Sequence, residues 1–523
     1  MIRSLLLAVV LLIVTPSDPK ISKDARTGYD SISASDLKAH LTFLASPELE
    51  GRETTYRGQK VAAKYIASVF QKLGLRPVGD HGSYFQHFDV EVTKISDESS
   101  IAITTKAGKK SYQFKKDFIT TTQRDTTLSG PVVFIGYADG NVDSTIAEAA
   151  AGKIALGLAR RSQAPADGGQ RRFRQPYQAL PKSLATLVVS DDSVTGSVAQ
   201  TVARFGGFLD KGSMRLTIGE GSGRPRQGGG SLAILVSPQL ANDLLQSSGQ
   251  TVEKLKEYGS KNDWKSALQT GATATVEMKI AREVKQSENV AGYLEGSDPK
   301  LKDELVVFSA HYDHVGVGSD GAIFHGADDD GSGTSTILEL AEAFVANPVK
   351  SKRSMLFLTV AGEEKGLLGS AYYVSKPIFP LDKTVANLNI DMIGRVDKKH
   401  EAMKEENYVY VIGSDKISTQ MDSVLKVANG ESENLALDYE FNDDNDPNQF
   451  YRRSDHYNFA RNGVPITFFF TGVHDDYHRP TDTVDKILFD RMAKIGRLVY
   501  TLGWKTATMP SQFKKDAKPS AYQ

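Results

Sequence analysis

The sequence predicts a doubly wound α/β fold with a second, smaller strand-rich domain inserted into it. From residue 285 onward, short apolar runs alternate with amphipathic helical patterns, as strands and helices do around a buried parallel sheet. Residues 127–275 instead hold short β-rich runs separated by glycine, proline and polar residues. With 523 residues, 40% of them hydrophobic and 24% charged, the chain can bury a core and form two or three domains.

The first twenty residues have the layout of a secretory signal. Arg3 precedes an apolar run from Leu5 to Val14, which is too short to span a bilayer comfortably. We therefore expect residues 1–20 to be a signal peptide and the protein to be secreted or periplasmic, without stable membrane association once the signal is removed. An uncleaved membrane anchor is the alternative.

Composition excludes several partners and sites. The formal net charge is −1, so nothing indicates a nucleic-acid partner. The chain has no cysteine, which excludes disulfides and thiolate metal ligands. Any metal must therefore be held by histidine and carboxylate side chains.

Two helices are expected near the N-terminus, before the insert. Residues 35–45 place Leu37, Leu41 and Leu44 on one helical face, and residues 58–73 repeat the helical spacing until Gly74. In the insert, the β-rich runs lie at 130–138, 152–159, 185–191 and 232–237.

The remaining chain is expected to form the main sheet. Continuous apolar runs, typical of buried parallel strands, lie at 304–310, 354–361, 383–391, 408–414 and 464–472. Residues 334–347 predict an amphipathic helix between the first two strands. The polar residues 506–523 are expected to be a disordered tail.

Histidine or carboxylate residues follow four of these strands. They are His311, Asp313 and His314 after the first, Glu363 and Glu364 after the second, Asp391 at the end of the third, and His474 and His478 after the fifth. The acidic triplet 328–330 follows the first strand as well, and all these residues should meet at one sheet edge. Histidine with carboxylate favours a zinc-like ion over Mg²⁺ or Ca²⁺. Two metals roughly 3.5–4 Å apart would need a shared carboxylate, which the triplet can supply.

These motifs resemble those of the M28 family of zinc aminopeptidases, in the secreted bacterial form that carries a protease-associated domain. The matching segments are SAHYDHVG, GADDDGSGT, AGEEKGLLGS, NIDMIGR and DYHRPTDT, within residues 309–483. The resemblance implies a phosphorylase/hydrolase-like fold, whose mixed, mostly parallel sheet is flanked by helices. It also implies that residues 127–275 are the protease-associated domain, between two parts of the peptidase domain at 28–126 and 276–505.

The resemblance implies a pair of zinc ions and their ligands. His311 and Asp391 resemble ligands of one zinc, Glu364 and His478 resemble ligands of the other, and Asp329 resembles the bridging carboxylate. Asp313 resembles the residue that hydrogen-bonds the His311 imidazole and fixes its tautomer. The family's cis peptide bond would fall between Asp329 and Asp330.

Glu363 resembles the general base, which takes a proton from the attacking water. Tyr477 matches a position from which a tyrosine can donate a hydrogen bond to the oxyanion. Asp455 lies in a segment that resembles one near the family's pocket. The other histidines of this region fall on no ligand position and are expected to line the pocket or to be structural: His314, His325, His456 and His474.

The implied function is that of a secreted dizinc exopeptidase, an aminopeptidase that acts on peptides through a hydroxide bridging the two metals. A carboxypeptidase on the same fold remains an alternative, because Arg452 and Arg453 could recognise a carboxylate. A glutaminyl cyclase, which typically uses one zinc, is another alternative. An inactive binding protein is disfavoured by the intact ligand set and Glu363. No pattern indicates an oligomeric state.

Overall fold

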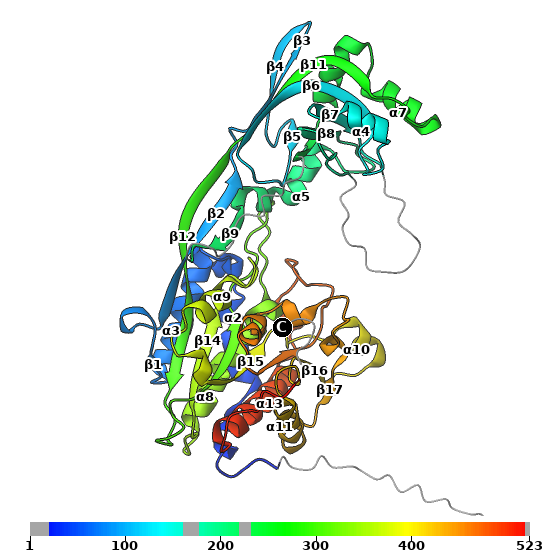
Figure 1. Ribbon diagram of the computed structural model, residues 1–523. Helices are drawn as coiled ribbons and strands as arrows, with labels where there is room; N and C mark the ends of the chain where they lie inside the picture. Colours follow the sequence, from blue (N-terminus) through cyan, green and yellow to red (C-terminus); the bar gives the residue numbers. More distant parts are fainter. Residues whose placement is uncertain (1–19, 161–176, 219–231, 518–523) are drawn as a thin grey trace, which may run out of the picture. The chain divides into compact units, whose positions relative to one another are not determined.

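The computed structural model describes residues 20–160, 177–218 and 232–517, so the predicted signal peptide lies outside the described residues except at Lys20. Contacts divide the chain into two compact units, drawn in Figure 1. The first unit comprises Met1–His87, Glu288–Val315 and Phe324–Gln523, and the second comprises Phe88–Ser287 and Gly316–Ile323. Within the described ranges, no helix is both long enough and apolar enough to cross a bilayer.

A mixed sheet forms the centre of the first unit, and seven consecutive strands of this sheet have the order β17-β16-β18-β15-β13-β14-β12. The strands are β12 (Ile280–Leu294), β13 (Leu305–His311), β14 (Ser354–Val360), β15 (Thr384–Ile390), β16 (Tyr408–Ile412), β17 (Ala436–Asp438) and β18 (Ile466–Phe470), and the short β1 (Arg76–Pro77) pairs with β12. Neighbours from β14 through β13 and β15 to β18 are parallel. Strands β12 and β16 are antiparallel to β14 and β18.

This arrangement confirms the predicted α/β class and the five expected strands. The sheet is mostly parallel, and its antiparallel pairs lie on either side of the parallel centre. All seven residues of β13, β14 and β15 are buried, which explains why their sequences are continuous apolar runs rather than alternating ones.

Helices pack around this sheet (Figure 1). They are α1 (Arg26–Ser31), α2 (Ala34–Leu44), α3 (Arg57–Lys72), α8 (Gly333–Ala346), α9 (Leu368–Ser375), α10 (Lys398–Met403), α11 (Thr419–Glu431), α12 (His456–Arg461) and α13 (Phe489–Thr508). Helix α2 begins at a cap in which the Ser33 hydroxyl accepts a hydrogen bond from the Asp36 N–H. The expected helices 35–45, 58–73 and 334–347 therefore appear as α2, α3 and α8.

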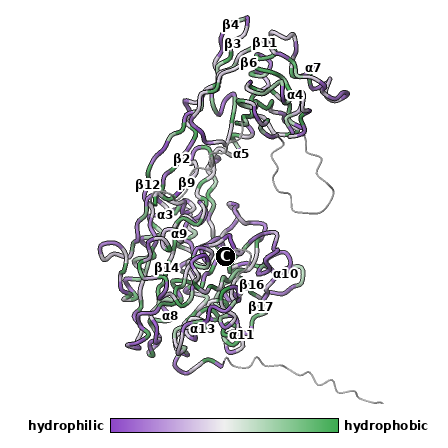
Figure 2. Tube along the Cα trace, in the orientation of Figure 1, coloured by the Kyte–Doolittle hydropathy of each residue, from purple (hydrophilic) through white to green (hydrophobic). Residues whose placement is uncertain are grey.

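Aromatic packing joins helices α8 and α13 to the centre of the sheet. The Phe308 ring of β13 lies 5.4 Å from the rings of Phe357 in β14 and Phe344 in α8. Gly503 lets α13 approach this cluster, because a Cβ atom there would lie 2.4 Å from the Phe308 ring. Figure 2 shows the hydrophobic colouring of such stretches running through both units.

The expected disordered tail is wrong for residues 506–517. Helix α13 continues to Thr508, and Thr506 and Ala507 are fully buried. Beyond the helix, Phe513 is only 5% exposed, and Asp516 accepts a hydrogen bond from the Thr419 N–H. One aromatic anchor and one carboxylate thus hold a segment whose composition is otherwise polar. Residues 518–523 lie outside the described residues.

The second unit is built on an eight-stranded sheet with the order β4-β3-β11-β6-β7-β8-β10-β5. Its strands are β3 (Ser100–Thr105), β4 (Gly108–Gln113), β5 (Phe118–Ile119), β6 (Thr126–Tyr137), β7 (Ile154–Leu158), β8 (Ala185–Val189), β10 (Leu232–Val236) and β11 (Leu268–Met278). Strand β2 (Phe85–Ile95) enters the unit and pairs with β9 (Ser213–Leu216). The unit's helices are α4 (Ser144–Ala149), α5 (Val198–Lys211), α6 (Pro238–Leu245) and α7 (Val252–Lys261).

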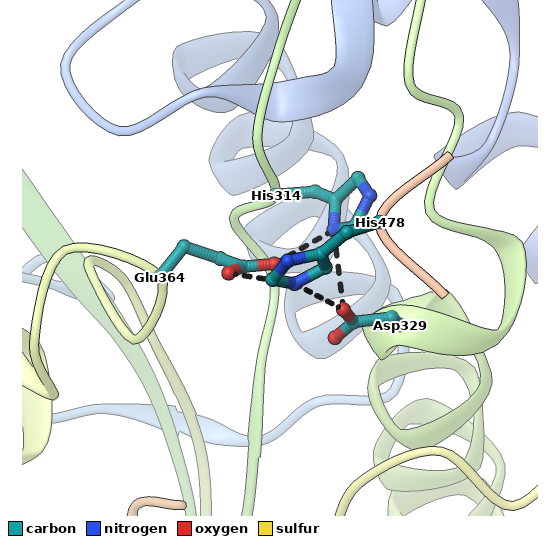
Figure 3. A group of neighbouring side chains, drawn as sticks. All are labelled: His314, Asp329, Glu364 and His478. Carbon is teal, nitrogen blue, oxygen red and sulfur yellow. Dashed lines mark ion pairs between the residues drawn. The ribbon is translucent and has the colours of Figure 1, made fainter. Parts of the chain in front are cut away.

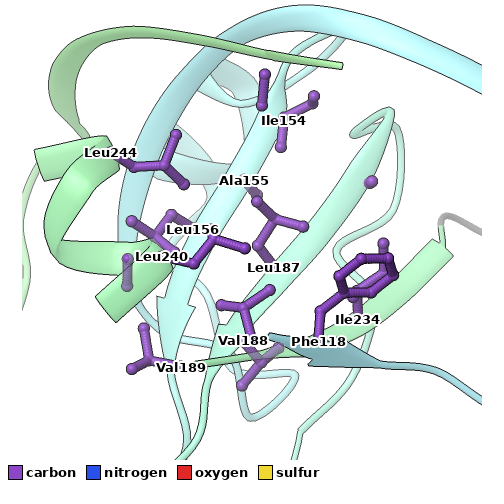
Figure 4. Packing of buried hydrophobic residues seen from close by; sticks show 14 of the residues in the cluster. Phe118, Ile154, Ala155, Leu156, Leu187, Val188, Val189, Ile234, Leu240 and Leu244 are labelled. Atoms are coloured by element: carbon purple, nitrogen blue, oxygen red, sulfur yellow. The ribbon is translucent and has the colours of Figure 1, made fainter. Parts of the chain in front are cut away.

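A separate hydrophobic core supports this second unit. Figure 4 shows side chains of β7, β8 and β10 packing with Leu240 and Leu244 of α6. The expected insert of residues 127–275 lies inside this unit, but the contacts extend it to residues 88–287. Strands β3 and β6 both pair with β11, so residues 100–105 join the same sheet as residues 268–278.

Candidate metal centre

The chemically active side chains of the first unit meet at the carboxyl ends of its parallel strands. His311 is the last residue of β13, and Asp391 directly follows β15. Glu363 and Glu364 lie in the loop after β14, and His478 lies in the loop after β18. The acidic triplet lies in a short helical turn, Ala327–Ser332, directly before α8. Sequence and topology therefore predicted this convergence correctly.

His311 stands at the centre of the first group of side chains. Its Nε2 atom lies 3.3 Å from Asp329 Oδ1, 3.7 Å from Asp391 Oδ1 and 3.9 Å from Glu363 Oε2. The His311 side chain is 1% exposed. Burial lowers the pKa of His311, but the carboxylates of Glu363 and Asp391 outweigh that effect and raise the pKa well above its ordinary value.

A second group surrounds the other oxygen of Asp329 (Figure 3). His478 Nε2 lies 3.0 Å from Asp329 Oδ2 and 3.0 Å from Glu364 Oε2. His314 joins this group, with its Nδ1 atom 2.9 Å from Glu364 Oε1 and 3.7 Å from Asp329 Oδ2. Asp329 thus faces both groups, which is the placement of a bridging carboxylate.

The three acids of the triplet differ in their hydrogen-bond partners. Asp328 accepts from the Gly394 N–H at 2.6 Å and pairs with His474 at 3.1 Å. Asp330 accepts N–H groups at both oxygens, those of Gly333, Met392 and His311. Asp329 Oδ2 has no hydrogen-bond partner among the described residues. The Asp329–Asp330 peptide bond is cis, as the resemblance implied.

Asp313 is held in place by two donors. The Thr54 hydroxyl donates to its Oδ2 at 2.7 Å, and the Glu363 N–H donates to its Oδ1 at 3.2 Å. The His311 Nδ1 atom lies 3.1 Å from the main-chain carbonyl oxygen of Asp313 and 3.7 Å from its carboxylate. The main-chain oxygen is therefore the nearer acceptor for the imidazole, whereas the carboxylate positions the loop of Glu363.

Several carboxylates are buried together at this site, and burial and their neighbours shift their pKa values. Burial raises the pKa of Glu363 well above its usual range, and neighbouring Glu364 and Asp391 raise it further. Burial and Asp391 likewise raise the pKa of Asp330. Burial alone would raise the pKa of Glu364, but His314 and His478 bring it down to about 2.

The buried polar atoms that lack a hydrogen-bond partner also gather here. Among the described residues they include His311 Nε2, both ring nitrogens of His314, Asp329 Oδ2, Glu364 Oε1 and His478 Nε2. Leaving a buried polar atom unpaired costs about 1–3 kcal/mol, so such a concentration needs a partner. Nitrogen and carboxylate donors without thiolate, arranged around excess negative charge, fit divalent metal ions of the zinc type.

A cavity opens beside these groups. Its wall includes Asp329, Glu363, Asp391, Arg453 and Tyr477 together with the apolar residues Met392, Phe450, Phe468, Phe470 and Val473. The Tyr477 ring stacks on the His478 ring at 3.9 Å, and its hydroxyl lies 3.5 Å from an Arg453 nitrogen. Burial raises the pKa of Tyr477, and Asp329 and Glu364 raise it further, so its hydroxyl keeps its proton.

Sequence reasoning missed two residues of this centre. The first is His314, which was expected to line the pocket or to be structural and lies within the second group. The second is Arg52, a fully buried residue that donates to the carbonyl oxygens of Tyr312 and Gly326. Tyr312 directly follows His311, and Gly326 directly precedes the acidic turn. Asp455 is also buried, and the Ser370 hydroxyl donates to it at 2.5 Å. The other histidines have their own partners, which are Ala45 O for His325, Tyr451 O for His456 and Asp328 for His474.

Comparisons with known proteins give a consistent result. The sequence model of peptidase family M28 matches residues 289–503 of this chain. The chain is 29% identical to aminopeptidase YwaD of Bacillus subtilis over 50% of this chain and 52% of that protein. It is 32% identical to a probable leucine aminopeptidase 2 of Aspergillus oryzae over 43% of this chain and 39% of that protein. The chain thus spans about half or less of these relatives' length.

Solved structures support the fold over nearly the whole chain. BSAP, a zinc aminopeptidase from Bacillus subtilis, superposes with a TM-score of 0.51 at 20% identity, covering 94% of this chain and 97% of that one. An aminopeptidase from Aneurinibacillus sp. strain AM-1 also gives a TM-score of 0.51, at 18% identity, covering 95% and 98% of the two chains.

Proposed function

We propose that the chain is a secreted dizinc aminopeptidase of peptidase family M28, whose model matches residues 289–503, and that it removes N-terminal residues from peptides. The observation that carries the proposal is the position of Glu363. Its carboxylate lies in the cavity wall, 3.9 Å from His311, yet it belongs to neither group of candidate ligands. A general base needs this placement, next to the metal ligands but free to move a proton.

The proposed ligands form two positions. The first metal position consists of His311, Asp329 and Asp391, and the second metal position consists of Asp329, Glu364 and His478. Asp329 is preferred to Asp330 as the shared ligand because both Asp330 oxygens already accept N–H groups. When bound, the two cations would acidify water and polarise the peptide carbonyl.

Glu363 would handle the proton in this reaction. It would accept a proton from the attacking water and return it to the amine that leaves. Its main-chain N–H is fixed on Asp313, so the carboxylate has a defined place in the cavity wall. Burial and nearby carboxylates raise the pKa of Glu363, so its carboxylate accepts a proton more readily than an exposed one would.

Tyr477 and the apolar wall would orient the substrate. The protonated hydroxyl of Tyr477 can donate a hydrogen bond to the carbonyl oxygen as negative charge develops on it. Met392, Phe468 and Phe470 offer an apolar surface to the terminal side chain. Buried carboxylates beside them suit a terminal ammonium group. We therefore propose a preference for large apolar N-terminal residues.

Arg453 supports a second candidate, a metallo-carboxypeptidase. It lines the same cavity as Glu363 and Asp391, and it also lines an adjoining cavity with Lys398 and Lys399. A guanidinium in that place could bind a terminal carboxylate. Arginine and lysine could equally bind an acidic residue further along a peptide, so the two reactions must be separated by experiment.

The test is a panel of peptides that are free, N-acetylated or C-amidated. Each peptide is incubated with the zinc-loaded protein, with the chelator-treated protein and with Glu363→Gln, and the released residues are identified by mass spectrometry. An aminopeptidase cleaves free and amidated peptides but not acetylated ones, whereas a carboxypeptidase cleaves free and acetylated peptides but not amidated ones. A cyclase instead releases ammonia from N-terminal glutamine. Cleavage that survives both the chelator and Glu363→Gln would refute the proposal.

A further inference from the structure

His314 belongs with the second metal position rather than with the surrounding structural residues. We infer that His314 Nδ1 is a further ligand there, so that this position has two imidazoles and two carboxylates. The inference rests on the proposed function, because it assumes that the protein binds metal. Neither the spacing of the sequence motifs nor the family resemblance assigns this role to His314.

The distances within the group agree with four ligands around one ion. Zinc binds histidine nitrogen and carboxylate oxygen at about 2.0–2.2 Å, which places tetrahedral ligand atoms about 3.3–3.6 Å apart. The nitrogen–oxygen distances in the group are 2.9, 3.0, 3.0 and 3.7 Å, with one Glu364 oxygen facing His314 and the other facing His478. Figure 3 shows the two imidazoles directed toward the same space as the two carboxylates.

The hydrogen bonding of His314 differs from that of a structural histidine. Its side chain is fully buried, and neither ring nitrogen has a hydrogen-bond partner among the described residues. His325, His456 and His474 each have a ring nitrogen hydrogen-bonded within 3.1 Å of an oxygen outside the second group, whereas the oxygen 2.9 Å from His314 Nδ1 is that of Glu364, itself a candidate ligand. Burying an imidazole without any such bond is costly unless a bound ion uses its lone pair.

The chain is shaped to hold the His314 ring in this place. A Cβ atom on Gly326 would lie 2.5 Å from His314 Cγ and 2.6 Å from Cδ2, so only glycine leaves room for the ring. The His314 N–H donates to the Arg52 carbonyl oxygen at 3.2 Å and fixes the main chain. The ring is therefore held near Asp329 and Glu364 before any ion binds.

This assignment makes the two metal positions chemically different. The second would have two imidazole ligands, whereas the first has only His311. Because imidazole suits zinc and carboxylate suits harder ions such as Mn²⁺, the second position should hold zinc more tightly. The first position should be the one that exchanges zinc for Mn²⁺.

Two measurements test the inference. The first is a crystal structure of the zinc-loaded protein with anomalous scattering at the zinc edge, in which we expect His314 Nδ1 about 2.1 Å from the second ion. The second is a zinc titration against a chromophoric chelator for wild type, His314→Ala and His325→Ala. His325→Ala is the matched control, because this nearby histidine bonds to the Ala45 carbonyl and not to the group.

We expect His314→Ala to weaken the binding of one zinc on the order of 100-fold, the upper end of the loss seen when only an outer partner is removed. His325→Ala should bind both ions as wild type does. If two ions bind but His314 Nδ1 lies beyond 3 Å from both, the inference is wrong while the proposed function stands. If the wild type binds no zinc, the proposed function fails with it. The crystal structure decides the matter even if His314→Ala does not fold.

Discussion

Arg52 offers a sharp test of how the chain supports the candidate metal centre. This fully buried guanidinium donates to the carbonyl oxygens of Tyr312, Leu44, His325 and Gly326, at 2.9, 2.5, 2.8 and 2.8 Å. Tyr312 lies between two site residues, and Gly326 begins the acidic turn. Arg52→Met keeps much of the side-chain volume but removes the charge and all four donors.

The expected loss of stability follows from those contacts. Each buried carbonyl left without a donor costs about 1–3 kcal/mol, but water entering the vacated space repays part of the sum. Removing one partner of a buried charge network costs about 3–5 kcal/mol. We therefore expect a loss of about 4 kcal/mol, or about 1000-fold in the unfolding equilibrium. With a urea dependence of about 3 kcal/mol per molar, the midpoint falls by about 1.3 M.

The two tryptophans allow the assay to report on the correct unit. Trp264 lies in the second unit and Trp504 in α13 of the first, so Trp264→Phe leaves one reporter for the metal-centre unit. Urea unfolding is followed by fluorescence in that background, together with zinc affinity. Arg353→Met is the control, because Arg353 is also fully buried and donates to the Thr506 and Met509 carbonyls.

Both variants should lose stability, but only Arg52→Met should lose zinc affinity as well. Arg52 fixes the main chain directly after His311 and at the start of the turn that carries Asp329, whereas Arg353 fixes the end of α13. A midpoint within about 0.3 M of the parent's would refute the energy argument. Equal zinc affinities in the two variants would refute the structural link between Arg52 and the centre.

Three further predictions concern the reaction, the metal and the pH dependence. Glu363→Gln should keep its zinc content but lose about 10²–10⁴-fold in kcat, measured by peptide hydrolysis and metal analysis. Asp329→Ala should lose zinc from both positions, and a normal metal content would contradict its bridging role. Burial raises the pKa of Glu339 to about 7, so the folded state binds its proton more tightly and stability should fall as pH rises from about 4.5 to 7. Glu339→Gln should reduce this pH-dependent loss of stability by about 2–3 kcal/mol. Urea midpoints that change equally with pH in the wild type and in Glu339→Gln would contradict the prediction.

The centre of the fold could be predicted because burial leaves a direct record in the sequence. Strands β13, β14 and β15 are buried on both faces, so their residues form unbroken apolar runs. Strand direction leaves no such record, and the antiparallel pairing of β16 with β18 could not be foreseen. The boundary of the second unit was equally hidden, since β3 pairs with a strand about 170 residues away.

The candidate site was predictable as a set of strand ends but not as a set of contacts. Topology brings His311, Glu364 and Asp391 to one edge whatever their neighbours are. The position of the His314 ring requires a residue without a side chain at Gly326, which lies twelve positions further along the chain. Arg52 donates to main-chain carbonyl oxygens. Because every residue type has such an oxygen, no sequence motif can reveal these contacts.

The acidic triplet shows why geometry must complete the motif. Three adjacent aspartates have the same charge and chemistry, so the sequence alone could not say which one faces a metal. Main-chain N–H groups make the distinction, since they donate to Asp328 Oδ1 and to both oxygens of Asp330, whereas Asp329 Oδ2 receives no hydrogen bond from the described main chain and faces the imidazole of His478 instead. A carboxylate already bonded to N–H groups has less to offer a cation than one that is not. The hydrogen bonds of the turn therefore leave Asp329 as the acid best able to bind a cation. Replacing Asp329 should weaken metal binding far more than replacing Asp328 or Asp330, although all three residues are aspartates.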